Sequence, residues 1–282
     1  CLEALRNDPN TQVIVILSKP PAKEVMADML KQLETVDKPV IAAFLGGDPS
    51  MLAGSRVVWA DDLEQAAKLA VLAEQGNPIQ LPAYDSKKLE HLADTLCAQL
   101  LPGQTCLRGL YSGGTLCYET MLLLQKEGIS TWSNIALDPA WKLPDGEPSR
   151  GDTLLDMGED FFTNGMPHPM IDFRQRVERM ECEAQDDSVA VLLLDCVGGY
   201  GTHQDPAGEL APAIQRVKEM AIKAGRELVV IASVTATEGD PQVCSTQIQV
   251  LEQAGAVVMP CNAQAARLAA CIIRRQRQEG KE

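Results

Sequence analysis

Aromatic residues, histidines and long hydrophobic runs are all scarce in this chain of 282 residues. Aromatics make up 4%, so the cores must consist mainly of Val, Ile, Leu, Met and Ala. Any histidine-dependent mechanism has to use His91, His168 or His203, since these are the three histidines. No hydrophobic run approaches the roughly 20 residues that span a bilayer, and no signal peptide is visible. The sequence therefore predicts neither a membrane span nor export.

Positive charge is also in short supply. The chain has 25 basic and 39 acidic residues, a formal net charge of −14. Nucleic acids and anionic membranes are bound through clustered positive charge, so we expect neither as a partner. A small anionic substrate stays compatible with this balance, because backbone N–H groups and one or two arginines are enough to hold it.

The nine cysteines show no C-x-x-C spacing and no pairing pattern. An odd number without a signal peptide indicates reduced thiols and a cytoplasmic protein. Cys1 stands where a natural start would have Met, and it leads directly into a helix-like pattern. We therefore expect the chain to begin inside a longer protein.

Short apolar runs alternate with helical patterns along the chain, and the length suggests about two domains. Such alternation predicts an α/β fold with parallel sheets and right-handed crossovers. We expect a small unit at 1–80, a linker with an amphipathic helix at 81–104, and a fuller strand–loop–helix unit at 105–282.

In the second unit, four strands are followed by loops rich in Gly, Thr, His and Asp. Ligands bind beyond the carboxyl ends of parallel strands, so these loops predict one shared site. The turn Ser112-Gly113-Gly114-Thr115 precedes a helix whose free N–H groups favour an anion. It is neither a Walker loop nor a G-x-G-x-x-G motif. The alternative is a tight turn with Thr115 as the N-cap.

Two further loops offer phosphate contacts. Gly199 and Gly201 lie in a glycine-rich loop that also carries His203 and Asp205, an acid–base pair in the functional interpretation. The alternative is a solvated loop in which Asp205 leads into the next helix. Thr235 and Thr237 follow the next strand, where hydroxyl and N–H groups could contact phosphate; the alternative there is ordinary Asp-Pro turn chemistry.

The loop from Asp156 to Pro169 resembles a lid, because two adjacent phenylalanines are unusual in a polar loop. His168 stands between two prolines, whose fixed backbone angles suit a positioned side chain or merely stiffen the loop. Asp156, Glu159 and Asp160 could ligate a metal, but loop carboxylates are usually solvated, so no metal site is predicted. Cys117 and Cys196 lie near these loops without an evident base, which argues against a cysteine nucleophile.

Several motifs carry a resemblance to known proteins. Residues 1–72 resemble the later part of the ligase domain of a succinyl-CoA synthetase alpha subunit, through an Asn-Asp-Pro-x-Thr turn and Lys38-Pro39-Val40. Residues 105–275 resemble the ligase domain of the beta subunit, through the glycine-rich turn and the Gly198-Gly199 loop. An alpha-like ligase domain followed by a beta-like ligase domain in one chain, together with the segments 109–117 and 165–172, is similar to the FdrA/YahF family of acyl-CoA-synthetase-like proteins.

The resemblance implies two flavodoxin-like, succinyl-CoA synthetase ligase-type domains, the first truncated at its N-terminus. Full-length members carry a Rossmann-like CoA-binding domain before this region, so CoA is expected only in the full-length protein. Succinyl-CoA synthetases pass phosphate through a histidine in a Gly-His-Ala-Gly segment soon after the Lys-Pro strand. The matching stretch here, 44–61, contains no His, so that relay cannot run as it does in the relatives.

We therefore expect a C-terminal ligase-domain fragment of an FdrA-type acyl-CoA synthetase that binds phosphate, or an acyl or carbamoyl phosphate, with Mg²⁺ as a cofactor to be tested. His168 or His203 would polarise an oxygen or transfer a proton. Alternatives are a carbamoyltransferase subunit of purine-ring nitrogen catabolism, a non-catalytic module that docks a partner subunit or a second copy, and a CoA ligase phosphorylated on a remaining histidine. The predicted phosphate contacts are Ser112, Gly113, Gly114, Thr115, Gly199, Gly201, Thr235 and Thr237.

Overall fold

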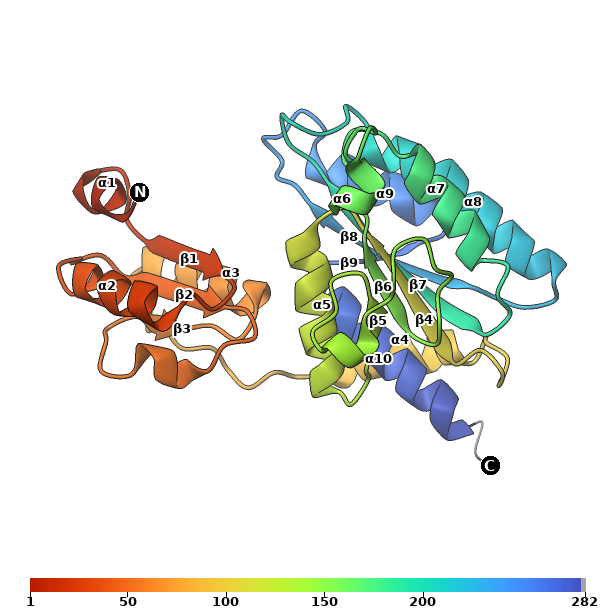
Figure 1. Ribbon diagram of the computed structural model, residues 1–282, viewed down its shortest axis with the longest axis horizontal. Helices are drawn as coiled ribbons and strands as arrows, with labels where there is room; N and C mark the ends of the chain where they lie inside the picture. The colour runs from red at the N-terminus through yellow and green to blue at the C-terminus, as the bar shows by residue number, and fades with distance from the viewer. Residues whose placement is uncertain (280–282) are drawn as a thin grey trace. The chain divides into compact units, whose positions relative to one another are not determined.

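The protein, described by a computed structural model for residues 1–279, divides into two compact units (Figure 1). The first covers Cys1–Tyr84 and the second begins at Asp85. Within residues 1–279, no helix is both long enough and apolar enough to cross a membrane. Each unit is built on its own parallel sheet, as the alternation of strands and helices predicts.

The first unit has a three-stranded sheet in the order β1-β2-β3. The central strand is buried along its whole length, which explains its unbroken apolar sequence. Asp62 caps the helix that follows β3 by accepting a hydrogen bond from the backbone N–H of Gln65 at 2.8 Å. The elements are α1 (Leu2–Asn7), β1 (Ile14–Ser18), α2 (Lys23–Leu33), β2 (Val40–Phe44), the 3-10 helix η1 (Pro49–Leu52), β3 (Val58–Trp59) and α3 (Leu63–Glu74).

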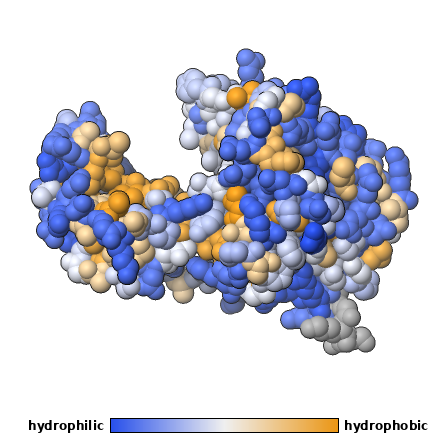
Figure 2. Space-filling view, viewed as in Figure 1, coloured by the Kyte–Doolittle hydropathy of each residue, from blue (hydrophilic) through white to orange (hydrophobic). Residues whose placement is uncertain are grey.

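Strand β1 is an edge of this sheet and leaves apolar side chains in solvent. Val15 and Leu17 are exposed, whereas Ile14 is buried. Figure 2 shows hydrophobic side chains gathered on the first unit in the region where Figure 1 draws β1. An open apolar edge strand is a template for pairing with a further strand.

The second unit has a six-stranded parallel sheet in the order β5-β6-β4-β7-β8-β9. Without the two-residue strand β5, the order of the other five strands in the sheet is β6-β4-β7-β8-β9. If these five are numbered by their sequence order, the sheet reads 2-1-3-4-5, and the direction of winding switches between β4 and β7. The strands are β4 (Cys106–Tyr111), β5 (Trp132–Ser133), β6 (Thr153–Asp156), β7 (Val189–Val197), β8 (Val229–Thr235) and β9 (Val257–Met259).

Helices cover both faces of this sheet (Figure 1). Leu89, Leu124 and Ile272, from α4, α5 and α10, share one core. Met180 and Leu210, from α7 and α8, share the other with residues of α9. The helices are α4 (Lys87–Cys97), α5 (Gly114–Lys126), α6 (Asp160–Thr163), α7 (Arg174–Glu183), α8 (Pro206–Lys223), α9 (Cys244–Gln253) and α10 (Asn262–Glu279), with the 3-10 helix η2 (Pro139–Trp141).

The segment interpreted as a linker, 81–104, contributes a helix to the second unit. Leu89, Ala93 and Cys97 of α4 are buried in the core that they share with α10, because they recur on one face of the helix. The stretch 128–151 contains β5 and η2, and the loop predicted from Asp156 to Pro169 contains the one-turn helix α6. Elements of two to four residues are too short to leave a periodic pattern in the sequence.

Candidate functional site

The carboxyl ends of β4, β6, β7 and β8 lie at one edge of the second sheet, and their loops are hydrogen-bonded to one another. The backbone N–H of His203 donates to the carbonyl oxygen of Met170 at 2.8 Å, joining the loops after β7 and β6. The Gln242 amide joins the loops after β8 and β7, since it donates to the carbonyl oxygens of Gly199 and His203 at 3.0 and 2.9 Å. The sequence prediction of four neighbouring loops thus matches their geometry.

Asp195, near the end of β7, holds the glycine-rich turn that follows β4. Its carboxylate accepts hydrogen bonds from the backbone N–H groups of Ser112 and Gly113, at 2.9 and 2.7 Å, and from the Ser112 hydroxyl at 2.9 Å. Two N–H groups that we expected to hold an external anion therefore bind an internal one. These hydrogen bonds shape the turn at Ser112 and Gly113.

Arg176 of α7 balances the charge of Asp195. Its Nη2 lies 2.6 Å from Asp195 Oδ1 and also donates to the carbonyl oxygen of Asp195, while its Nε donates to the carbonyl oxygen of Leu110 at 3.0 Å. Both side chains are 0% exposed. A buried pair of this kind ties the ends of β4 and β7 together at the switch point, and neither member can be removed alone without leaving a buried charge.

Helix α5 begins one residue after the Asp195-bound groups. Gly113 is the N-cap, so Thr115 lies inside the helix, not at the N-cap position considered above. The N–H groups of Gly114 and Thr115 have no carbonyl of their own helix to bind, and they stand at the positive end of the helix dipole. A Cβ on Gly114 would lie 2.3 Å from Asp156 Oδ2, so any larger residue at this position requires the carboxylate or the helix start to shift.

His168 reaches the same turn from the loop after β6. Its Nδ1 accepts a hydrogen bond from the backbone N–H of Met170 at 3.2 Å, which assigns the proton of the neutral ring to Nε2. Nε2 lies 2.8 Å from the point where a Cβ on Gly158 would stand, and Asp156 Oδ1 and the Ser112 carbonyl oxygen both lie 3.1 Å from that point. His168, Asp156 and the β4–α5 turn therefore converge on Gly158.

His203 has different surroundings. Its Nδ1 accepts a hydrogen bond from the backbone N–H of Asp205 at 3.1 Å, its ring meets Phe173 edge-on at 5.8 Å, and its Nε2 lies 3.9 Å from Glu209 Oε1. Asp205 acts as the N-cap of α8, where its carboxylate accepts from the Gly208 N–H. The two residues expected to form an acid–base pair thus each have a structural partner.

The other predicted phosphate contacts lie along the same edge. Gly199 has a φ of +131°, a conformation that favours glycine, and its N–H donates to Gln242 Oε1 at 3.0 Å. Gly201 has open space around it, and Thr235 is exposed at the end of β8. The N–H and hydroxyl of Thr237 both donate to Asp240 Oδ2, at 2.6 and 2.9 Å, so Thr237 closes its own turn.

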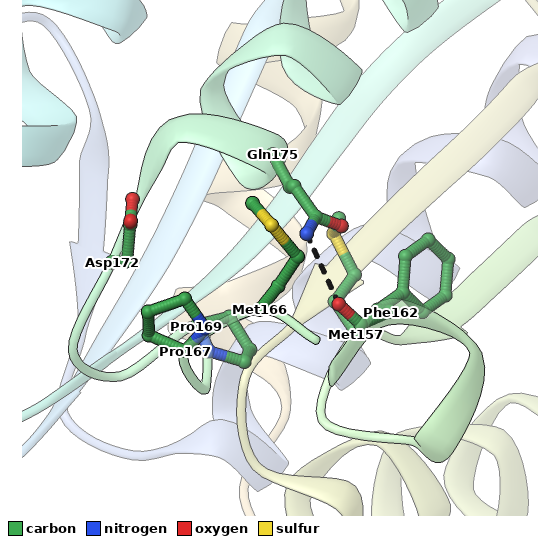
Figure 3. A pocket seen from close by; sticks show the side chains of 7 residues that line it. All are labelled: Met157, Phe162, Met166, Pro167, Pro169, Asp172 and Gln175. Atoms are coloured by element: carbon green, nitrogen blue, oxygen red, sulfur yellow. Dashed lines mark hydrogen bonds between the residues drawn. The ribbon is translucent and has the colours of Figure 1, made fainter. Parts of the chain in front are cut away.

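A small pocket lies under the Pro167-His168-Pro169 segment (Figure 3). Its volume is about 10 Å³, room for one water molecule, so it cannot hold an acyl phosphate. Gln175 of α7 donates to the carbonyl oxygen of Phe162 at 3.0 Å and fastens the loop over it. The predicted lid is therefore anchored here. The lining residues are Met157, Phe162, Met166, Pro167, Pro169, Asp172 and Gln175.

In the described part of the chain, 1–279, no three or more His, Cys, Asp or Glu side chains gather in a way that could hold a metal ion. A Mg²⁺ site built wholly from protein side chains therefore has no candidate among these residues. Asp156, Glu159 and Asp160, considered as ligands above, do not form such a group.

Two thiols near the site are buried. Burial raises the pKa of Cys117 well above its usual range and that of Cys196 to about 12. Because the thiolate is the reactive form, we expect neither to react with iodoacetamide in the native protein at pH 8, whereas the exposed Cys182 reacts within minutes. Peptide mass spectrometry of the alkylated protein measures this; rapid labelling of Cys117 would restore it as a candidate nucleophile.

Sequence reasoning missed Asp195, Arg176 and Gln242 as organisers of the site. Asp195 left a signal, since it is the one charged residue in the otherwise apolar strand Val189–Val197, near its carboxyl end. Arg176 and Gln242 left none, because each resembles a surface residue of a helix or turn until its partners are known.

Comparison with known proteins identifies relatives. The family model described as CoA-ligase matches residues 110–272. The chain is 37% identical over 254 residues to the Escherichia coli (strain K12) protein "Uncharacterized protein YahF", an alignment covering 90% of this chain and 49% of that protein. The chain thus spans about half the length of that curated relative.

Solved structures give only remote matches. PH0766 from Pyrococcus horikoshii OT3 aligns with 16% identity and a TM-score of 0.40, covering 100% of this chain and 56% of its own. A D-isomer specific 2-hydroxyacid dehydrogenase from Lactobacillus delbrueckii ssp. bulgaricus aligns with 12% identity and a TM-score of 0.29, covering 95% and 97%. Scores this low do not establish a shared overall arrangement.

Proposed function

The chain belongs to the CoA-ligase family, and we propose that its second unit is the ligase domain of an FdrA-type, acyl-CoA-synthetase-like protein that binds phosphate, or an acyl or carbamoyl phosphate, at the carboxyl ends of β4 and β6. The observation that carries the proposal is the convergence of His168 Nε2, the Asp156 carboxylate and the Ser112 carbonyl oxygen on one point beside Gly158, with the same carboxylate against Gly114 at the start of α5.

Phosphate oxygens would accept hydrogen bonds from the N–H groups of Gly114 and Thr115, assisted by the dipole of α5. His168 would donate a hydrogen bond from Nε2–H to the phosphoryl or acyl oxygen and stabilise the negative charge that develops there during transfer. Ser112 and Gly113 would act indirectly, because Asp195 fixes their N–H groups and with them the direction of the helix start. Catalysis on this account is chiefly positioning and electrostatic stabilisation.

An anion at the start of α5 would stand beside the buried carboxylate of Asp156, and a cation between the two would offset their repulsion. Mg²⁺ commonly takes one or two protein carboxylates and completes its shell with water and substrate phosphate oxygens. We propose that Asp156 supplies the carboxylate for an ion that arrives with the acyl phosphate, while Gly199, Gly201 and Thr235 face the outer part of the ligand. His203 would act, if at all, at that outer part.

The direct test is calorimetric titration with inorganic phosphate and with carbamoyl phosphate, each with and without MgCl₂. We expect millimolar or tighter binding that strengthens with MgCl₂ and weakens at least tenfold in His168→Ala. His203→Ala is the matched control and should retain affinity within about twofold, since its ring packs against Phe173. Absence of heat under all conditions, or equal affinity in His168→Ala, would refute the proposal.

A carbamoyltransferase role is the second candidate. The stretch 44–61 corresponds to the segment in which succinyl-CoA synthetases carry their phosphorylated histidine. In this chain it forms the end of β2, η1 and β3 and contains no His. Carbamoyl transfer needs no phosphohistidine, so this observation favours it over ATP-driven CoA ligation. Incubation with labelled ATP and assay of acid-labile phosphate separates the two, since only the ligase with a substitute histidine would retain label.

The first unit is, on our proposal, the later half of a flavodoxin-like domain, and CoA would bind only in a longer protein. Its sequential order β1-β2-β3 matches that of β7-β8-β9, the later half of the second sheet. A preceding strand would then pair with β1 and cover Leu17. A Leu17→Cys thiol should react at least tenfold more slowly in a longer protein that includes the preceding half than in this chain; equal rates would contradict the pairing.

A further inference from the structure

Exposed apolar side chains gather in the loops at the carboxyl edge of the second sheet. In the described part of this unit, the loops after β6, β7 and β8 carry most of its exposed large hydrophobic residues, the others being Leu101 and Ile222. Tyr200 is the extreme case, with 90% of its surface in solvent. Exposed apolar residues concentrated in neighbouring loops are typical of an interaction surface. We call these residues the rim: Phe161, Met166, Ile171, Tyr200 and Val243.

The rim is presented on fixed backbone. The loops that carry it are joined through the His203–Met170 and Gln242–Gly199 hydrogen bonds. Phe162 lines the pocket of Figure 3, and its ring contacts the exposed ring of Phe161 edge-on, with the centroids 5.1 Å apart. A partner would therefore meet a surface that needs little ordering on binding.

The charge around the rim is mainly negative, with Arg174 at the start of α7 paired to Asp172. The loops 157–173, 198–205 and 236–243 contain six acidic residues and no lysine or arginine. A second copy docking through the same loops would set these carboxylates against one another, and an anionic membrane or a nucleic acid would be repelled. Charge complementarity therefore favours, as the partner of the rim, a basic surface on a different protein. The acidic residues are Glu159, Asp160, Asp172, Asp205, Glu238 and Asp240.

We propose that the rim is the docking surface for a protein domain whose apolar pocket is bordered by lysine and arginine, with Tyr200 as the central anchor. Tyrosine is favoured as an interface anchor because it adds a large rigid surface at low entropic cost. Such a partner would close over the edge of the sheet where the candidate site lies. The proposal rests on exposure and charge alone and does not require that phosphate binds.

The test places the photo-cross-linker p-benzoylphenylalanine at position 200 of the chain in cells of the source organism, with position 222 as the control. Ile222 is also apolar and exposed, but it lies near the other end of α8, outside the rim. Peptide sequencing should identify one dominant product at position 200, at least fivefold above position 222, joined to a segment rich in lysine and arginine.

Charge reversal provides the matched comparison. Glu159→Lys combined with Asp160→Lys should reduce the position-200 product at least tenfold, whereas Glu219→Lys, on the exposed face of α8, should leave it unchanged. The proposal is overturned by a product no stronger than at position 222, by a second copy of this chain as the product, or by a product that survives the charge reversal. These readouts are independent of phosphate binding, so either proposal can fail alone.

Discussion

Replacing Arg176 by methionine is expected to lower the free energy of unfolding of the second unit by about 3–5 kcal/mol. The guanidinium is fully buried and pairs with Asp195, while it also satisfies the carbonyl oxygen of Leu110. Methionine fills similar space but leaves the Asp195 carboxylate buried without its counter-ion. Urea unfolding followed by the fluorescence of Trp132 and Trp141, in a Trp59→Phe background, reports the change in this unit.

The control is Arg174→Met, two residues earlier. Arg174 pairs with Asp172 at the surface, where its own side chain is 72% exposed, so we expect a loss within about 1 kcal/mol. The pair Arg176–Asp195 should also show coupling: Asp195→Asn in the Arg176→Met background should cost less than it does alone. Equal losses for Arg174→Met and Arg176→Met would mean that the buried pair does not organise the β4–α5 turn.

Gly114→Ala is expected to lower stability by about 1–3 kcal/mol and to weaken phosphate binding at least tenfold. In an ordinary helix this change stabilises by about 1 kcal/mol, so the sign itself is informative. Here the added Cβ would stand 2.3 Å from Asp156 Oδ2, and either the carboxylate or the helix start must shift. Urea unfolding and calorimetric titration with phosphate measure the two effects.

Two variants separate this contact from a general effect of added methyl groups. Gly201→Ala, in the neighbouring loop with open space around it, should change stability by less than about 0.5 kcal/mol. Asp156→Ala combined with Gly114→Ala should recover most of the stability, because it removes the colliding carboxylate. If Gly114→Ala alone were as stable as the parent, Asp156 would be free to move and the proposed geometry would be wrong.

The sequence predicted the architecture of the second unit because its information is local. An apolar run such as Val189–Val197 and a glycine turn such as Ser112-Gly113-Gly114 each indicate an element, and parallel strands bring their carboxyl ends to one edge. The α/β fold with two parallel sheets is confirmed. The family resemblance is confirmed by the CoA-ligase match and the 37% identity to YahF.

The interior of the site was not predictable in the same way. Whether the backbone N–H of Gly113 faces a ligand or an internal carboxylate depends on Asp195, which lies 82 residues away in the chain and comes into range through the pairing of β4 with β7. Arg176 reaches the ends of both strands from a third element, α7. Such long-range partners leave no spacing in the sequence, so the roles of His168 and of the phosphate contacts stay predictions until a ligand is observed.

We propose that phosphate binds where α5 begins, beside His168. A crystal structure of the protein grown with phosphate and MgCl₂ tests this most directly. We predict an anion within hydrogen-bond distance of the N–H groups of Gly114 and Thr115 and of His168 Nε2, with the Asp195–Ser112 contacts unchanged. The crystals should be grown at phosphate concentrations that saturate the calorimetric titration. If no anion is bound at the start of α5 under these conditions, or if an anion is bound at Gly199–His203 alone, the proposal is contradicted.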